Sequence, residues 1–415
     1  MMTYIVDWSI YYSRNAKLAF LNFQLTGTLS VRGGEQGNII MSNEKPYDNN
    51  KIYGIQYLRG FAALLVVTWH TWWVIGPEWK AIIKHFFIGV DIFFVISGFI
   101  IYSITSEKFN VTLKSFIAKR FFRIYPAFAF IWLIVFTIRF NDASFYDSLR
   151  SLLLFHVDYT AIAPAFKYNI IGPAWTLTYE IYFYAIFISA CCISRKYRGL
   201  ISSVIIISFS VLLQLFYNGK FDFASNVSAH TGSNSVFFAP ISVLSCTMMW
   251  EFIAGMFLAW LYQASASLRS NINPYYKIAA SILLILYFMR ALFSDENLLQ
   301  GITGFLAPSF CLVFGVLLLS EMLSIELKPL SFIGNISYSI YLSHWALIYT
   351  VPVFVPHVWS MMPKPYNVIT FVMITIIVSA LMYRYIEKPS IRFCRNLLAC
   401  SEDEVKKPIN NSSSA

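Results

Sequence analysis

The sequence predicts an all-α polytopic membrane protein with about ten transmembrane helices and both termini in the cytoplasm. Of its 415 residues, 58% are hydrophobic and only 13% are charged, and the mean hydropathy is +0.60. An average soluble domain carries about 25% charged residues, so water could not cover this much apolar surface. The composition therefore excludes a disordered chain and argues against a soluble globular protein.

Ten apolar segments predict the membrane part, because a transmembrane helix needs roughly 20 apolar residues. The first and the fourth contain ionisable side chains, which are costly within a bilayer unless they are paired. In chain order the ten segments are 57–75, 86–104, 121–138, 173–194, 199–217, 240–263, 276–293, 301–322, 333–354 and 366–386.

The distribution of Lys and Arg predicts the orientation. If the N-terminus is cytoplasmic, about three quarters of the 31 Lys and Arg residues fall in inner segments, as the positive-inside rule requires. Topology thus accounts for most of the net charge of +10. We expect a multi-pass protein of the plasma membrane, which is the inner membrane in a Gram-negative cell.

Three regions are expected along the chain: a leader at 1–50, a membrane domain at 51–390, and a cytoplasmic tail at 391–415 that is partly disordered. Met41 begins a polar stretch that runs into the first span, so we hypothesise that translation starts there and that 1–40 is not native. The longest outer loops are expected at 139–172 and 218–239.

Arg59 and His70 stand eleven residues apart in the first segment. Eleven residues are almost three helical turns, so both side chains share one face, roughly 16 Å apart along the axis. Taken singly, Arg59 could extend to the interface and His70 could form an ordinary interhelix hydrogen bond. Together on one stripe they favour a functional site.

Five ionisable residues from five segments fall in one broad layer of the membrane. Each alone could be a structural hydrogen-bonding group, but together they indicate a buried polar cavity. They are His70, Asp91, Glu180, Glu251 and His344.

A second layer is expected at the cytoplasmic rim, where Arg120 and Arg123 lie one turn apart near the level of Arg59. Three guanidinium groups could clamp phosphates, although the positive-inside rule explains basic residues there equally well. Trp175 and Tyr341 are further candidates for the lining of the buried polar cavity. Alternatively, Trp175 lies at the membrane interface and Tyr341 takes part in ordinary packing. No Cys or His cluster has metal-ligand spacing, so no metal is expected.

Five motifs occur in order along the chain: LRGFAALLVVTWH, IGVDIFFVISGFII, AKRFFRIYP, PAWTLTYEIYFY and ISYSIYLSHW. Over about 53–390 the sequence resembles the acyltransferase-3 family of integral membrane acyltransferases, which O-acylate surface polysaccharides and related molecules. The family's Arg-x10-His motif corresponds to Arg59 and His70. Its RxxR motif corresponds to Arg120 and Arg123.

The family's Trp-Ser-Leu…Glu motif corresponds to Trp175 and Glu180, with Thr176 in place of the usual serine. That change retains the hydroxyl group. Some relatives carry a fused SGNH hydrolase-like domain. This chain ends soon after its tenth segment, and we expect it to act without one.

The resemblance implies an acyl-CoA donor from the cytoplasm, most often acetyl-CoA, whose phosphates would rest on the three arginines. The expected partners are acyl-CoA, membrane lipids and a polysaccharide or lipid-linked glycan acceptor, with O-antigen of lipopolysaccharide as the leading expectation. As a mechanism we expect His70 to act as general base on a sugar hydroxyl. Asp91 or Glu180 would orient its imidazole. An acyl-enzyme route is the alternative mechanism.

Two other classes compete with an enzyme. A transporter or flippase of an acyl or glycan intermediate would also place ionisable residues inside the membrane as a proton relay, but no inverted repeat is visible. A non-catalytic receptor would not need Arg59 and His70 on one stripe. The basic residues are spread over several loops, which argues against nucleic-acid binding. The sequence leaves the oligomeric state open.

Overall fold

The computed structural model describes residues 52–71, 77–105, 112–138, 144–167, 170–322, 326–354 and 366–405. Within these ranges every regular element is a helix, and a single β-bridge joins Asp158 to Lys167. The predicted leader at 1–50 and the tip of the tail lie outside the described ranges. The all-α prediction is confirmed for the residues that the structure describes.

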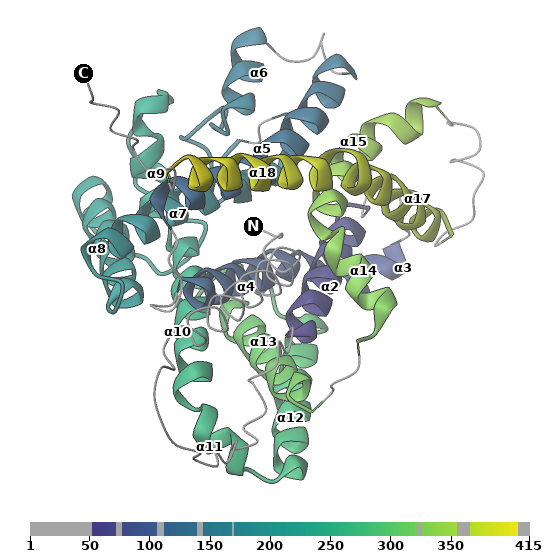
Figure 1. The fold of residues 1–415 in the computed structure, drawn as a ribbon. Helices are drawn as coiled ribbons and strands as arrows, with labels where there is room; N and C mark the ends of the chain where they lie inside the picture. Colours follow the sequence, from purple (N-terminus) through teal and green to yellow (C-terminus); the bar gives the residue numbers. More distant parts are fainter. Residues whose placement is uncertain are drawn as a thin grey trace, which may run out of the picture.

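Each of the ten predicted segments contains a helix, and short helices connect several of them (Figure 1). The main helices are α2 (Tyr53–Trp69), α3 (Pro77–Ile83), α4 (Gly89–Ile104), α5 (Leu113–Ile138), α6 (Phe145–Leu152), α7 (Trp175–Ile193), α8 (Arg198–Asn218), α9 (Ala239–Ser245), α10 (Trp250–Ala264), α11 (Ala266–Asn271), α12 (Pro274–Leu292), α13 (Leu306–Ser320), α14 (Lys328–Asn335), α15 (Ser337–Phe354), α17 (Tyr366–Met382) and α18 (Lys388–Val405).

The described part of the chain does not confirm the predicted number of ten spans. By length and composition, six helices in the described part of the chain qualify, or seven if the bent pair α9 and α10 is one span. That pair bends by 60°. Helices α2 and α13 have only 17 and 15 residues, which is shorter than a full span of roughly 20. Several apolar helices nevertheless make this a multi-pass membrane fold.

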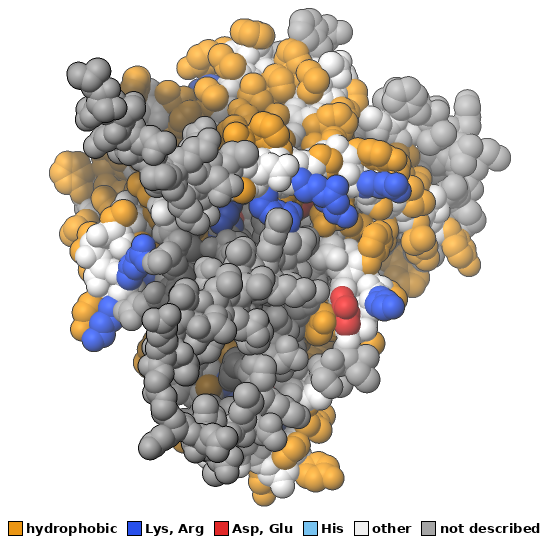
Figure 2. All heavy atoms as spheres, viewed as in Figure 1, with side chains coloured by type: hydrophobic (Ala, Val, Ile, Leu, Met, Phe, Trp, Pro, Cys, Tyr) orange, Lys and Arg blue, Asp and Glu red, His pale blue; other side chains and the backbone are white. Residues whose placement is uncertain are grey.

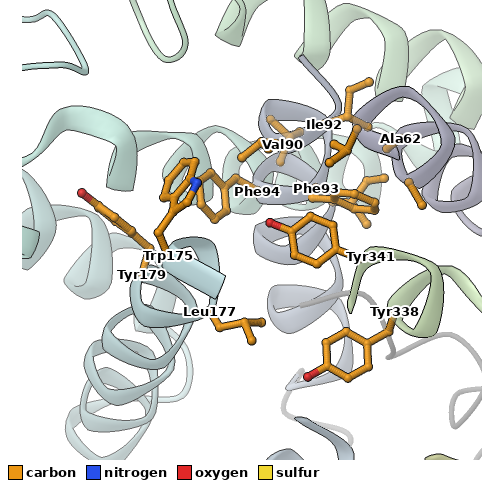
Figure 3. Close-up of a cluster of buried hydrophobic side chains, with 14 of the residues drawn as sticks. Ala62, Val90, Ile92, Phe93, Phe94, Trp175, Leu177, Tyr179, Tyr338 and Tyr341 are labelled. Carbon is orange, nitrogen blue, oxygen red and sulfur yellow. The ribbon is translucent and has the colours of Figure 1, made fainter. Parts of the chain in front are cut away.

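Helix α4 is the centre of the packing, because it is buried on all sides from Gly89 to Ile101. It packs against α2, α10 and α13. Figure 3 shows Phe93 and Phe94 of this helix among aromatic side chains of α7 and α15. The ring of Phe93 lies 6.0 Å from that of Tyr341, and the ring of Phe94 lies 6.1 Å from that of Trp175. The core thus joins α4 to the two helices that hold most of the site.

Small residues allow α4 and α10 to approach closely. A Cβ atom built on Gly255 of α10 would overlap the carbonyl oxygen of Val95, and one on Gly98 of α4 would overlap the carbonyl oxygen of Phe252. Both obstacles are backbone atoms, which cannot move aside without shifting a helix. Close backbone approach at small residues is a common way to pack transmembrane helices.

We expect Gly255→Leu to destabilise the protein by at least about 1–3 kcal/mol, because overpacking would separate α4 from α10. The measurement is the thermal midpoint of purified protein in detergent, together with its yield as a single peak in size exclusion. Ala264→Leu is the matched control, since Ala264 is exposed at the end of the same helix. Equal stability of the two variants would contradict this packing.

Candidate functional site

Arg59 and His70 both face α15, as their spacing predicts. The Nη2 atom of Arg59 donates to Oγ of Ser337 at 3.1 Å. The ring centroid of His70 lies 5.0 Å from that of His344. Helices α2 and α15 therefore run side by side with two meeting points, one at the start of α15 and one two turns later. The shared face of Arg59 and His70 is confirmed.

The two imidazoles are held in the same way. Nδ1 of His70 lies 2.8 Å from the carbonyl oxygen of Val66, and Nδ1 of His344 lies 3.1 Å from that of Ile340. A carbonyl oxygen can only accept, so Nδ1 carries the hydrogen in both rings and Nε2 keeps the lone pair when the ring is neutral. Nε2 of His344 is buried and has no partner among the described residues. A neutral ring with the hydrogen on Nδ1 and a lone pair on Nε2 is the tautomer that a general base needs.

Helix α15 is fixed to the start of α7 by three side chains. The hydroxyl of Tyr341 donates to the carbonyl oxygen of Pro173 at 2.8 Å and lies 2.7 Å from Oγ1 of Thr176. Nε1 of Trp345 donates to the carbonyl oxygen of Ile170 at 3.0 Å. These bonds bring the Trp175 motif beside the histidine pair. The hydroxyl of Thr176 thus has a structural role, because it bonds to Tyr341. A serine at this position could form the same bond.

The three arginines gather at the other end of this face and are all buried: Arg59 is 0% exposed, Arg120 8% and Arg123 3%. The charge of Arg123 interacts with those of Arg59 and Arg120. Nη2 of Arg123 lies 3.5 Å from Oε1 of Glu387, and Oε2 of Glu387 accepts a hydrogen bond of 2.7 Å from Ser339. The arginine cluster expected from the sequence is therefore present as a spatial group. We use this name for Arg59, Arg120 and Arg123.

Glu180 belongs to the neighbourhood of the arginine cluster. Its Oε1 accepts a hydrogen bond from the hydroxyl of Tyr184, and its charge interacts with those of Arg59 and Arg120. The guanidinium of Arg120 lies 4.8 Å from the centre of the Tyr184 ring, a cation–π contact. The conformation thus directs Glu180 toward the arginines.

Asp91 points away from α2. Gly89 of α4 packs against Ala62 and Val66 of α2. Asp91 is two residues further on, which is a rotation of about 200° around the helix. Its Oδ1 accepts a hydrogen bond of 2.9 Å from the backbone N–H of Gly301, and its carboxyl group interacts with that of Glu251 in α10.

The single polar layer expected from the sequence is therefore three separate groups. His70 pairs with His344, Asp91 pairs with Glu251, and Glu180 lies with the arginines. Depth in the membrane says nothing about the direction in which a side chain leaves its helix, which is why equal depth did not mean contact. The group seen to hold the imidazole of His70 is the backbone carbonyl of Val66, where a carboxylate was expected.

Glu387 is a site residue that sequence reasoning missed. It is 1% exposed and bridges α15 and α5 through Ser339 and Arg123. The signal was present, since it is an isolated acidic residue within the basic run after the tenth segment. Within the described part of the chain, no three His, Cys, Asp or Glu side chains are grouped so that they could hold a metal ion.

The two outer loops are joined by Asn234. Its side chain accepts from the backbone N–H of Tyr159 at 3.0 Å and donates to the carbonyl of Val157 at 2.7 Å. The outer loop at 139–172 contains three tyrosines: Tyr146 is 61% exposed, Tyr159 is buried, and residue 168 lies outside the described ranges. Tyr146 alone of the two described tyrosines is accessible to a sugar.

His156 in the same loop is fully buried, between the rings of Tyr159 and Phe166. Burial, with a smaller effect of the Arg150 charge, lowers its pKa to about 3. An unfolded histidine titrates near 6.5, so the unfolded chain takes up the proton first as the pH falls. The stability that this residue contributes is complete above pH 6.5 and is lost between pH 6.5 and 3.

We expect acidification from pH 7 to pH 5 to cost about 2 kcal/mol of stability through His156, at about 1.4 kcal/mol per pH unit below 6.5. His156→Phe keeps an aromatic ring against Tyr159 and Phe166 and removes the titration. The thermal midpoint of each protein at both pH values is the measurement. If the wild type and the variant lose the same stability, buried His156 does not cause the acid sensitivity.

A model of the acyltransferase-3 family, described as an acyltransferase domain, matches residues 52–384. This range contains the histidine pair and the arginine cluster, and it ends just before Glu387. No solved structure matches the chain.

Three curated relatives illustrate the likeness. The chain is 27% identical over 382 residues to O-acetyltransferase OatA of Staphylococcus aureus, a match that covers 83% of this chain and 58% of the relative. It is 25% identical over 376 residues to the putative peptidoglycan O-acetyltransferase YrhL of Bacillus subtilis, covering 83% and 56%. It is 26% identical over 326 residues to the putative membrane-bound transacylase BcsY of Komagataeibacter xylinus, covering 72% and 73%. The chain thus spans little more than half the length of the first two relatives.

Proposed function

Because the chain belongs to the acyltransferase-3 family, we propose that it is a membrane O-acetyltransferase. It moves an acetyl group from acetyl-CoA to a hydroxyl group of a surface polysaccharide or of its lipid-linked precursor. The observation that carries this proposal is the pairing of α2 with α15, which places Arg59 beside Ser337 and His70 beside His344. One end of this face suits an anion, and the other offers a base.

The arginine cluster is the proposed entry for the donor. We take both termini to be cytoplasmic, as the distribution of Lys and Arg predicts. In that orientation the arginine cluster faces the cytoplasm, which supplies acyl-CoA. The phosphates approach the arginines, and the pantetheine arm extends along α2 toward His70, roughly 16 Å away along the axis. Guanidinium groups suit phosphates because they combine a permanent charge with several donors. Glu180 and Glu387 hold the cluster together while the donor is absent.

His70 is the proposed general base. Its Nε2 takes the proton of the acceptor hydroxyl while the oxygen forms a bond to the thioester carbonyl carbon. The carbon–sulfur bond then breaks, and the coenzyme A thiolate receives the proton from His70. The carbonyl of Val66 keeps the ring in the required tautomer. The apolar surroundings exclude water, which limits hydrolysis of the thioester.

The acceptor is proposed to be the O-antigen of lipopolysaccharide, as the family resemblance suggests, with peptidoglycan as the competitor. The names of two relatives favour O-acetylation in general, and one of them specifies peptidoglycan. NMR of O-antigen and of peptidoglycan from a deletion strain and its parent tests the proposal. Loss of O-acetyl signals from O-antigen supports it, whereas loss from peptidoglycan alone replaces the acceptor. Retention of every acyl signal in both polymers would contradict the proposed function.

A further inference from the structure

Four basic side chains form a stripe along α18 and the short π-helix Tyr383–Glu387 that precedes it. They occupy positions 384, 388, 392 and 395, and spacings of four, four and three residues place them on one side of a helix. Arg384, Lys388 and Arg392 are exposed and Arg395 is half-buried. Figure 2 shows Lys and Arg side chains gathered along the edge of α18 that faces the centre of the molecule. We call these four residues the α18 stripe.

The α18 stripe adjoins the arginine cluster. Lys388 directly follows Glu387, whose carboxylate pairs with Arg123. Ser390 donates a hydrogen bond of 2.5 Å to the carbonyl of Phe122 in α5, the helix that carries both Arg120 and Arg123. Helix α18 therefore packs against the helix that carries two of the three arginines, and the exposed stripe begins next to the residue that pairs with Arg123.

A different side of α18 is apolar and exposed. Phe393 is 57% exposed and Leu397 is 48% exposed. Leu397 lies nine residues after Lys388, or two and a half turns, and so points in the opposite direction. The apolar side of α18, which is suited to contact with lipid tails, therefore points away from the α18 stripe. Within the described residues, none of the four basic side chains takes part in an ion pair. Three of them, Arg384, Lys388 and Arg392, are exposed and accessible to a ligand.

The charge of the arginine cluster is too small for the proposed donor. Three guanidinium groups and the carboxylates of Glu180 and Glu387 leave a formal charge of about +1, because the two carboxylates cancel two of the arginines. Coenzyme A carries a pyrophosphate and a 3′-phosphate, about four negative charges in all, since a phosphate monoester alone carries close to two. The α18 stripe supplies four further positive charges beside the cluster.

We propose that the α18 stripe binds the 3′-phosphate end of the acyl-CoA donor. This inference rests on the proposed function and extends it. The nucleotide lies along the exposed stripe, while the pyrophosphate and the pantetheine arm continue to the buried arginines. The 3′-phosphate, which is remote from the reacting thioester, is recognised by Lys388 and Arg392. Recognition of this phosphate selects thioesters of coenzyme A over thioesters whose carrier lacks the 3′-phosphate.

The test compares two ligands on the purified full chain in nanodiscs of neutral phosphatidylcholine. We expect the wild type to bind coenzyme A at least about tenfold more tightly than 3′-dephospho-coenzyme A. A tenfold ratio corresponds to a difference in binding free energy of about 1.4 kcal/mol. The variant Lys388→Gln/Arg392→Gln loses this preference, and Lys388→Arg/Arg392→Lys keeps most of it. The matched control Arg195→Gln/Lys196→Gln, at two exposed positions between α7 and α8, leaves the preference unchanged.

A second arm separates the donor phosphate from lipid phosphate. The same proteins are measured in nanodiscs that contain anionic phosphatidylglycerol. If the glutamine variant keeps the full preference for coenzyme A and loses only a response to phosphatidylglycerol, the stripe binds lipid headgroups and the inference is wrong. If the wild type binds neither form of coenzyme A in either bilayer, the proposed function itself fails. Size exclusion of each variant confirms that it is folded.

Discussion

We expect His70→Gln to lower the rate of acetyl transfer by about 10²- to 10⁴-fold, which is the usual contribution of a general base. Glutamine fills a similar volume and can still donate to the carbonyl of Val66, so the position of the side chain is retained. It has no basic nitrogen to take the proton of the acceptor hydroxyl. The measurement is the steady-state rate with labelled acetyl-CoA and glycan acceptor, and binding of acetyl-CoA is expected to be unchanged.

His85→Gln is the control for this change. His85 is a buried histidine whose Nδ1 lies 3.3 Å from the carbonyl oxygen of Leu292, at the end of α12. We expect its replacement to leave the rate within a few-fold of the wild type. Should the two variants lose activity equally, or should His70→Gln remain active, His70 is not the base.

The second large effect concerns the buried ion pair of Arg123 and Glu387. We expect Arg123→Gln to destabilise the protein by about 3–5 kcal/mol, because it removes the guanidinium group that pairs directly with the buried Glu387 carboxylate. In the double variant Arg123→Gln/Glu387→Gln, both charges are gone and Ser339 can still bond the amide, so much of the stability returns. The thermal midpoint in detergent measures both effects.

The same pair separates stability from donor binding. In the double variant the arginine cluster has lost a guanidinium group, so we expect the KM for acetyl-CoA to stay at least about tenfold above the wild-type value although the fold is restored. Glu387→Gln alone keeps all three arginines and is expected to retain a KM close to that of the wild type. A wild-type KM in the double variant would show that Arg123 serves the fold alone.

The sequence was sufficient for the features that depend on periodicity along one helix. The apolar segments predicted the helices, and eleven residues between Arg59 and His70 correctly placed both on one face. The same reasoning holds for Ser337 and His344 in α15. The predicted number of ten spans is not confirmed in the described part of the chain, because α9 and α10 meet at a bend of 60° and α2 and α13 are short.

Contacts between different helices could not be read in this way. Asp91 and His70 have similar depths, yet α4 presents Gly89 to α2 and turns Asp91 toward α10. The rotation of each helix about its own axis depends on packing partners that are distant in the sequence. The pairing of Arg123 with Glu387 spans most of the chain, and spacing within one segment gives no sign of it.

Transfer of label from acetyl-CoA across a reconstituted bilayer tests the central claim most directly. Purified protein is placed in proteoliposomes with a glycan acceptor inside, and acetyl-labelled coenzyme A is added outside. We predict labelled O-acetyl glycan in the wild type, and none with His70→Gln in protein that still binds the donor. Donor-independent movement of the glycan with no labelled product would contradict the account and would instead indicate a transporter.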